Sequence, residues 1–167
     1  MVIRQTERLV MQIIQKMIPD TEDRRDLSQE IYLKAFKHIA TFRFESKLST
    51  WIAQIAYNAC FNHLKKKKVV LIPSYPEWME NEHTEEDSEE EEKLLHARDL
   101  SNILASAIEK LPVLYQTLIT LYHNEELSYK EMSEITGMPE GTLKSYLFRA
   151  RLQLKESLLK RYKKEEL

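Results

Sequence analysis

Residues 128–155 read SYKEMSEITGMPEGTLKSYLFRARLQLK, a pattern that predicts a helix-turn-helix. The first helix turns Met132 and Ile135 inward and ends at Gly137, a residue that can take the positive φ of many helix C-termini. Pro139 then starts the second helix, where its missing N–H costs nothing. We therefore expect two short helices joined by a tight turn, with Ser128 as the cap of the first.

The second helix of this motif is apolar on one side and basic on the other. Its apolar stripe repeats every three or four residues: Leu143, Leu147, Ala150, Leu154 and Leu158. The outward side chains are then Ser145, Phe148 and Arg149, flanked by Lys144 and Arg151. Residues 141–164 hold eight Lys or Arg against one acid, whereas a solvated face usually mixes both signs. This favours DNA binding over an ordinary solvated hairpin.

The composition indicates an all-α chain. Two glycines and five prolines among 167 residues leave little turn chemistry for a many-stranded β fold. The lone cysteine excludes an internal disulfide, and no apolar run approaches the roughly 20 residues of a membrane span. The N-terminus lacks an export signal. We expect a cytoplasmic protein without membrane insertion.

The charge is divided strongly along the chain. Residues 77–92 contain ten acids and no Lys or Arg, so the remaining residues, with 25 basic and 17 acidic side chains, carry a net charge of +8. Like charges extend a chain, and two prolines interrupt the preceding segment. We therefore expect two small helical domains at 1–68 and 93–167, joined by an acidic flexible linker at 69–92. The acid run is either a solvated spacer or a segment that keeps the basic domains off DNA.

Three apolar-periodic segments predict the first domain, at residues 4–18, about 20–39, and 49–64. Acids near Asp20 suit the start of the middle helix. Its stripe is expected to comprise Leu27, Ile31, Ala35 and Ile39, widened by Tyr32 and Phe36. Ser49 or Thr50 is expected to cap the third helix. Two further segments, 94–111 and 113–122, precede the helix-turn-helix, so four helices complete the second domain.

The first domain also contains a mixture typical of single-stranded nucleic-acid binders. The loop 41–47 carries two rings and two cations, and Lys65–Lys68 follow a helix bearing Asn58 and Asn62. Cations attract phosphates, while flat rings stack on bases. Taken alone, the cluster favours the simpler alternative, in which Tyr57 and Phe61 are core or surface aromatics and the lysines are a solubilising cap.

No pattern supports enzyme activity. Cys60 and His63 stand three apart on a helix, but the other histidines are scattered, so we expect no metal site. The sequence has no glycine-rich phosphate-binding loop. No histidine stands at a spacing that indicates a catalytic base with a nucleophile and an orienting partner. We therefore expect no catalytic residue and no cofactor.

Two segments together resemble the extracytoplasmic-function (ECF, group IV) sigma factors of the sigma-70 family. Residues 23–68 resemble the −10-binding domain, σ2, through DLSQE at 26–30, a Phe-containing loop, and TWIAQIAYN at 50–58. Residues 108–155 resemble the −35-binding domain, σ4, through LP, SYKEMSE, and PEGTLKSYLFRAR at 139–151. Both motifs in this order, separated by an acidic segment, are highly specific.

The resemblance implies a sigma factor that binds the RNA polymerase core, recognises promoter DNA at −35 and −10, and promotes melting, with bond formation left to the polymerase. An anti-sigma factor is a common further partner in this family. The residues implied to bind the core polymerase are Asp26, Gln29 and Glu30. Those implied for the −10 element are Phe42, Arg43, Phe44, Lys47, Trp51, Asn58, Asn62, Lys65, Lys66 and Lys67. Those implied for the −35 element are Thr142, Lys144, Ser145, Phe148, Arg149 and Arg151.

The chain departs from the family pattern at three places. Tyr146 stands where the family usually has Arg, Gln116 replaces a common Arg, and the −10 loop lacks a frequent glycine. Two other functions remain open from the sequence. One is a stand-alone helix-turn-helix regulator that binds duplex DNA as a dimer. The other is an interaction protein whose N-terminal helices titrate a partner.

Overall fold

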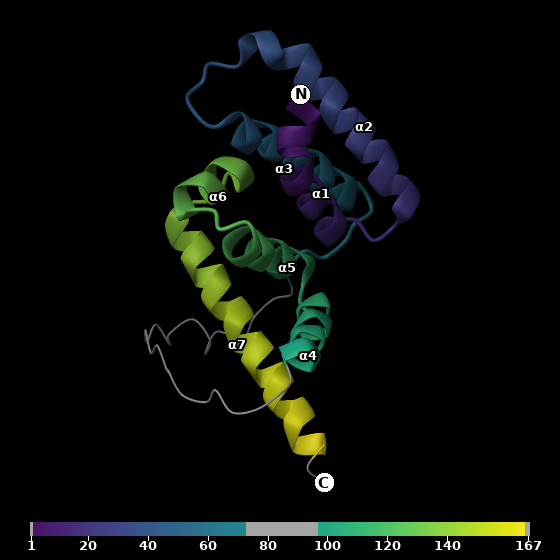
Figure 1. Ribbon diagram of the computed structural model, residues 1–167, viewed down its shortest axis with the longest axis vertical. Coiled ribbons are helices and arrows are strands. Elements are labelled where there is room, and N and C mark those ends of the chain that lie inside the picture. The colour runs from purple at the N-terminus through teal and green to yellow at the C-terminus, as the bar shows by residue number, and fades with distance from the viewer. Residues whose placement is uncertain (1, 73–96, 166–167) are drawn as a thin grey trace.

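The computed structural model describes residues 2–72 and 97–165, and in this part of the chain all regular structure is helical (Figure 1). The first half contains α1 (Val2–Met17), α2 (Thr21–His38), a 3-10 turn η1 (Ile39–Thr41) and α3 (Leu48–Lys66). The second half contains α4 (Ala97–Glu109), α5 (Val113–Ile119), a π-helical turn η3 (Thr120–Asn124), α6 (Tyr129–Thr136) and α7 (Glu140–Glu165). The all-α prediction is confirmed. The acid run at 77–92 lies outside the described residues.

Helix α2 begins as its sequence predicts. The Asp20 carboxylate accepts a hydrogen bond from the backbone N–H of Asp23 at 2.9 Å, which satisfies one of the free amides of the first turn. The stripe expected on α2 is correct in part, because Leu27, Ile31, Tyr32 and Ala35 are buried. The prediction that Phe36 joins this buried stripe is wrong. Its side chain is 51% exposed, because at about 100° per residue it lies on the opposite side of the helix from Leu27.

Ile39 is the second error in that stripe. It lies in the 3-10 turn and is 39% exposed. A spacing of four residues drifts by about 40° per step, so after three steps the side chain has left the buried face.

Helix α3 is the centre of the first half. It packs on both α1 and α2 and buries the side chains of Ile52, Ala53, Ala56, Tyr57, Ala59, Cys60 and Leu64. The helix begins at Leu48, earlier than predicted, and its N-cap is Lys47, whose side chain makes no capping bond. The expected cap at Ser49 or Thr50 is therefore wrong, and Thr50 is buried instead.

The helix-turn-helix forms as predicted. Ser128 Oγ accepts from the backbone N–H of Glu131 at 3.2 Å, and the Glu131 carboxylate accepts from the backbone N–H of Ser128 at 2.9 Å, a reciprocal capping box. Gly137 ends α6 with φ +75°, a conformation that costs other residues energy. Pro139 precedes α7 rather than opening it, and its carbonyl accepts from the N–H of Leu143.

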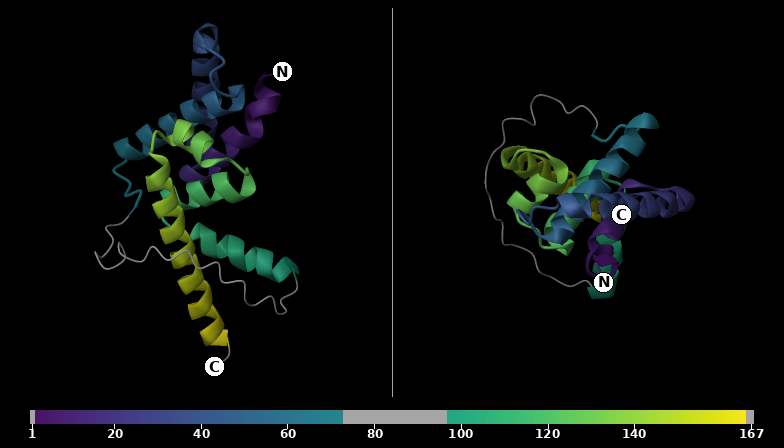
Figure 2. Two further views of the ribbon diagram at one scale, coloured as in Figure 1. Left: turned by 90° about the vertical axis from the view of Figure 1, so that its left-hand side faces the viewer. Right: turned by 90° about the horizontal axis from the view of Figure 1, so that it is seen from above.

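The two halves pack against each other and share one hydrophobic cluster. Helix α3 contacts α6, and α1 contacts α5, while the C-terminal part of α7 extends away from the first half (Figures 1 and 2). Residues 71–72, just after α3, also pack on this cluster, and the N–H of Leu114 donates to the carbonyl of Leu71 at 3.4 Å. The chain thus crosses onto the second half before residue 73.

Membrane insertion was not expected from the sequence. Among the described helices, none combines the length and the apolar character needed to cross a bilayer.

Candidate nucleic-acid interface

Three rings form a ladder at the start of α3. We call Phe42–Lys47, the segment between η1 and α3, the aromatic loop. The ring of Phe42 lies 4.7 Å from that of Phe44 and 5.2 Å from that of Trp51. Phe44, at the outer end, is 85% exposed. An exposed phenylalanine at the end of a supported ring ladder offers a flat apolar face to a ligand.

Phe44 also holds an unfavourable backbone conformation. Its φ is +58°, the left-handed region that glycine enters freely and that costs other L-residues about 1–2 kcal/mol. This loop lacks a glycine, so Phe44 takes the left-handed position itself. Strained residues concentrate at functional sites, where the neighbouring structure enforces them.

A cavity of about 360 Å³ lies beside the ring ladder. The aromatic loop and the first turns of α3 line most of it, with hydroxyl and amide groups from Ser46, Thr50 and Gln54. One wall belongs to the other half of the molecule, because Glu134 of α6 also lines the cavity. Rings beside hydrogen-bonding groups form a suitable receptor for an unstacked base.

The basic end of α3 is exposed. Lys65 to Lys68 all face solvent, as do Asn58 and Asn62 earlier on the same helix. Lys67 also makes an internal ion pair, with its Nζ 2.5 Å from Asp23 Oδ2. The hydrogen bond from Lys67 lowers the pKa of the Asp23 carboxyl, and the same bond raises the pKa of Lys67. Lys65 and Lys66 have no such partner in the part of the chain described.

Four other side chains of α3, two rings and two potential metal ligands, are buried or half-buried. Tyr57 is buried, so it cannot stack on a base, and Phe61 is half-buried beside it. Burial raises the pKa of the Cys60 thiol to about 12, and His63 Nε2 lies 3.1 Å from Asp23 Oδ2. Within residues 2–72 and 97–165 no three potential ligands gather into a metal site.

The first turns of α7 carry the side chains predicted to contact DNA, but most of these side chains are partly covered. Thr142, Ser145, Phe148 and Arg149 are each half-buried, so they are less fully outward than the stripe indicates. Lys144 is exposed, with its Nζ 5.2 Å from the centre of the Tyr129 ring.

Arg151 is already engaged within the domain. Its guanidinium lies 5.2 Å from the centre of the Tyr122 ring and within 3.3 Å of His123 Nε2. Burial and the neighbouring Arg151 charge both lower the pKa of His123. Arg151 therefore supports the packing of α7 on η3 as well as facing solvent.

The outer face of α2 is a second exposed surface. Asp26, Gln29 and Glu30 are exposed as predicted, and with Leu33 they line a shallow cavity of about 350 Å³. Leu33 is 69% exposed and Phe36 is 51% exposed, so this face is mixed apolar and polar. Sequence reasoning missed Leu33. Its position, 240° around the helix from Leu27, was the available signal.

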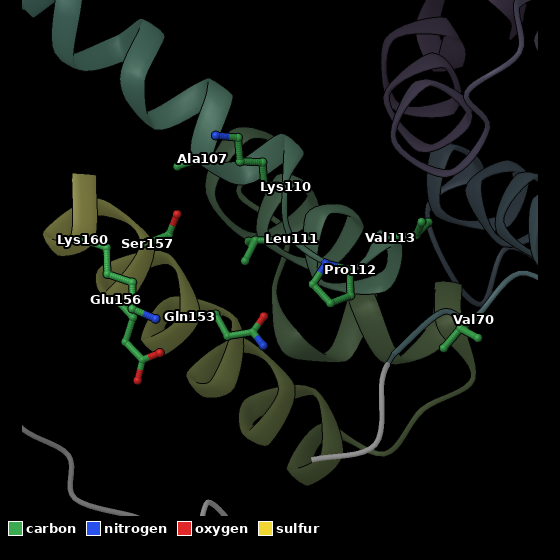
Figure 3. A pocket seen from close by; sticks show the side chains of 10 residues that line it. All are labelled: Val70, Ala107, Lys110, Leu111, Pro112, Val113, Gln153, Glu156, Ser157 and Lys160. Carbon is green, nitrogen blue, oxygen red and sulfur yellow. The ribbon is translucent and has the colours of Figure 1, made fainter. Parts of the chain in front are cut away.

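Another cavity, of about 640 Å³, lies away from the aromatic loop and from the outer face of α2, between the end of α4, α7 and Val70 (Figure 3). Leu111, Pro112 and Val113 form its apolar part, and Lys110 and Lys160 lie at its rim. Gln153, Glu156 and Ser157 of α7 line its polar side.

The sigma-70 class of transcription factors accounts for both halves. The Sigma-70 region 2 family matches residues 2–69, and the Sigma-70 region 4 family matches residues 101–154. The ECF RNA polymerase sigma factor SigW of Bacillus subtilis is 32% identical over 158 residues, covering 89% of this chain and 82% of its own length. The chain belongs to the ECF RNA polymerase sigma factors.

Two further comparisons agree with this assignment. The RNA polymerase sigma-H factor of Pseudomonas aeruginosa is 28% identical over 154 residues, covering 89% of this chain and 80% of its own length. The sigma factor RpoE, solved in complex with the anti-sigma factor NepR from Bartonella quintana, has the same fold, with a TM-score of 0.65. That match covers 93% of each chain at 20% identity. The sigma-factor interpretation is therefore favoured over a stand-alone regulator.

Proposed function

We propose that this sigma factor binds the RNA polymerase core, places it on a promoter with −35 and −10 elements, and opens the −10 region by trapping an unstacked base. The observation that carries the proposal is that one chain combines an exposed ring ladder beside a cavity with a helix-turn-helix whose second helix is basic. The chain itself makes and breaks no bond, and it acts in the cytoplasm, where the polymerase is.

The outer face of α2 is the proposed core-binding surface. Asp26, Gln29 and Glu30 are exposed there beside exposed Leu33 and Phe36. Apolar side chains surrounded by polar ones are typical of a protein–protein contact. Glu30 already pairs with Lys34 at 2.8 Å, so its carboxylate is oriented along the helix.

The aromatic loop is the proposed site of −10 opening. A base that leaves its stack costs a few kcal/mol, and ring stacking returns about 1–3 kcal/mol per base. Phe44 and Phe42 supply the rings, Trp51 supports them, and the adjacent cavity supplies polar groups. Phosphates of the displaced strand then meet Arg43, Lys47 and the lysines at the end of α3. Asn58 and Asn62 are exposed along the same helix.

The start of α7 is the proposed −35 reader, inserted in the major groove as in other helix-turn-helix proteins. Lys144 and Arg149 are suited to guanine edges or phosphates, and Thr142 and Ser145 to either. Phe148 can contact a thymine methyl group. Arg151 is assigned to a phosphate, because its guanidinium is held against Tyr122.

The domain boundaries follow from these roles. We assign −10 and core binding to residues 1–68, −35 binding to 93–167, and a connecting role to 69–92. An anti-sigma factor is a proposed further partner, supported by the similar sigma factor solved with NepR.

Run-off transcription with purified core polymerase on a library of genomic promoters tests the proposal. We expect initiation at a small set of start sites only when this chain is added, and those sites should share two sequence elements. A chain that binds a palindromic duplex tightly without polymerase, and starts no transcript with it, would be a stand-alone regulator. A chain that binds the core without directing initiation would be an interaction protein.

A further inference from the structure

Two cations of α7 that are assigned to DNA each lie on an aromatic ring. Lys144 Nζ lies 5.2 Å from the centre of the Tyr129 ring, and the Arg151 guanidinium carbon lies 5.2 Å from the centre of the Tyr122 ring. The two rings lie 5.1 Å apart, so the four side chains form one continuous row. We call Tyr122, Tyr129, Lys144 and Arg151 the ring–cation row. It joins η3, the first residue of α6 and the first half of α7.

The spacing on α7 places both cations on the same flank of the helix. Lys144 and Arg151 stand seven positions apart, which at about 100° per residue returns the side chain to within about 20° of its starting direction. The same step advances along the helix by about 10 Å. Both cations are exposed, whereas Tyr122 and Tyr129 are half-buried and pack against the hydrophobic cluster. The packed rings therefore form a base on which the cations lie at the surface.

A ring orients a cation without cancelling its charge. It attracts the cation through its quadrupole and carries no net charge itself. Among the described side chains, no carboxylate forms an ion pair with Lys144 or Arg151. Lys67 at the end of α3 is the opposite case, because the Asp23 carboxylate that holds it also neutralises it. Lys144 and Arg151 thus keep their full charge for phosphates, although each is already oriented.

His123 holds the guanidinium of Arg151 at its edge. Arg151 Nη2 lies 3.3 Å from His123 Nε2, and because a guanidinium only donates, the histidine nitrogen accepts and the imidazole is neutral. The His123 ring meets the Tyr122 ring edge-on, with centres 5.0 Å apart and planes at 82°. Burial and the Arg151 charge both lower the pKa of His123, which favours the neutral form. Arg151 is therefore fixed by a ring against its face and by an acceptor at one edge.

Orientation before binding matters for long cationic side chains. Free lysine and arginine side chains occupy many rotamers, and part of this freedom is lost when they contact DNA. A side chain that is ordered beforehand loses less, so the affinity is higher. A guanidinium that stacks on a ring still presents N–H donors at its remaining edges, and these match phosphate oxygens. The ring–cation row is therefore suited to prepare two contacts before the DNA arrives.

We propose that Tyr122 and Tyr129 are positioning residues for −35 binding, which hold Arg151 and Lys144 in the direction of the DNA. This inference rests on the proposed role of α7 as the −35 reader. The two rings act through the cations, so the contribution of each ring should vanish once its cation is removed. A ring that only supported the fold would contribute equally with and without its cation.

A double-mutant cycle in the full chain tests this link between ring and cation. The chain is assembled with core polymerase, and its affinity is measured for a fluorescent promoter fragment found by run-off transcription. Tyr122→Leu removes the ring and keeps an apolar side chain, whereas Tyr122→Phe keeps the ring and is the matched control. Each substitution is made with Arg151 intact and with Arg151→Ala.

We expect Tyr122→Leu to weaken binding about twofold to fivefold while Arg151 is present, and to have no further effect in the Arg151→Ala chain. Tyr122→Phe should stay within about twofold of the unchanged chain. Arg151→Ala should weaken binding and lower the slope of log affinity against log salt by about 0.9, because one phosphate contact is lost.

A second cycle measures the other end of the row independently. Tyr129→Leu should weaken binding by a similar factor, and this loss should disappear in the Lys144→Ala chain. Tyr129→Phe is again the control. Circular dichroism shows whether each variant folds, and this cycle decides the question if Tyr122→Leu does not fold.

Three results would contradict the inference. Equal losses from the ring substitutions with and without the cation would mean that the rings act only through the fold. Unchanged affinity in both Tyr122→Leu and Tyr129→Leu would mean that the rings contribute nothing to DNA binding. If Arg151→Ala and Lys144→Ala leave affinity and salt dependence unchanged, the −35 assignment of these cations fails, and the positioning role fails with it.

Discussion

The two proposed DNA-binding surfaces, the start of α7 and the aromatic loop, are built in opposite ways. The start of α7 is regular, capped and supported by fully buried Leu143, Leu147 and Ala150. The aromatic loop is irregular, and its outermost ring, Phe44, is both exposed and held at a positive φ. A regular helix suits a duplex groove that is already formed, while exposed rings suit bases that must be captured after they leave the stack.

The largest expected effect is on the support of the recognition helix. Leu147→Ala removes a fully buried side chain, which should lower the free energy of unfolding by about 2–5 kcal/mol. Urea denaturation followed by circular dichroism measures this. Exposed Leu159, on the same helix, provides the control, because Leu159→Ala should change stability by less than about 0.5 kcal/mol. Equal losses for both variants would contradict the assigned core.

Arg149→Ala separates DNA binding from stability and from core association. If Arg149 contacts a base edge, its loss should weaken use of −35 elements by about 1–3 kcal/mol, while affinity for the core polymerase stays unchanged. Competition between promoters with intact and scrambled −35 elements measures the effect. Loss of core association in this variant would mean that the roles are assigned to the wrong surfaces.

Phe44→Ala should weaken open-complex formation by about 1–3 kcal/mol, because one stacking ring is lost. Permanganate reactivity of unpaired thymines in the −10 region measures the opening. Phe44→Gly should open DNA as poorly as Phe44→Ala does. It should nevertheless unfold at a higher temperature than Phe44→Ala, because glycine accepts the positive φ of this position. Phe44→Tyr keeps the ring and should retain most activity. A fully active Phe44→Gly chain would exclude the stacking role.

The smallest expected effect is a pH dependence of stability at the Lys47–Glu131 pair. The pKa of Glu131 is lowered and that of Lys47 raised by their hydrogen bond. The pair therefore stabilises the folded state fully between pH 4.5, the ordinary pKa of a glutamate, and pH 10.5, the ordinary pKa of a lysine. It is lost as pH falls through the lowered pKa of Glu131, or rises through the raised pKa of Lys47. Glu131→Gln should lower the melting temperature slightly at pH 7, and by less as the pH falls through the lowered pKa of Glu131. An equal difference at every pH would exclude the ion pair as the cause.

The same comparison explains how much the sequence predicts. Periodicity, Ser128 and Gly137 act over one or two turns, so they predict the helix-turn-helix directly. The positive φ of Phe44 is imposed by the way η1 and α3 are joined, which no local pattern encodes. The errors at Phe36 and Ile39 arose because a four-residue spacing drifts around a helix. The contacts of Lys47 and Arg8 link residues 84 and 117 positions apart, so only the tertiary structure brings them together.

Hydroxyl-radical footprinting of core polymerase with this chain, on a promoter found by run-off transcription, tests the account most directly. We predict two protected regions in one complex, centred near −35 and −10. Arg149→Ala should remove only the upstream region, and Phe44→Ala should impair only the opening downstream. A single protected region, or the same footprint from the chain without polymerase, would contradict the assignment of two DNA-binding surfaces.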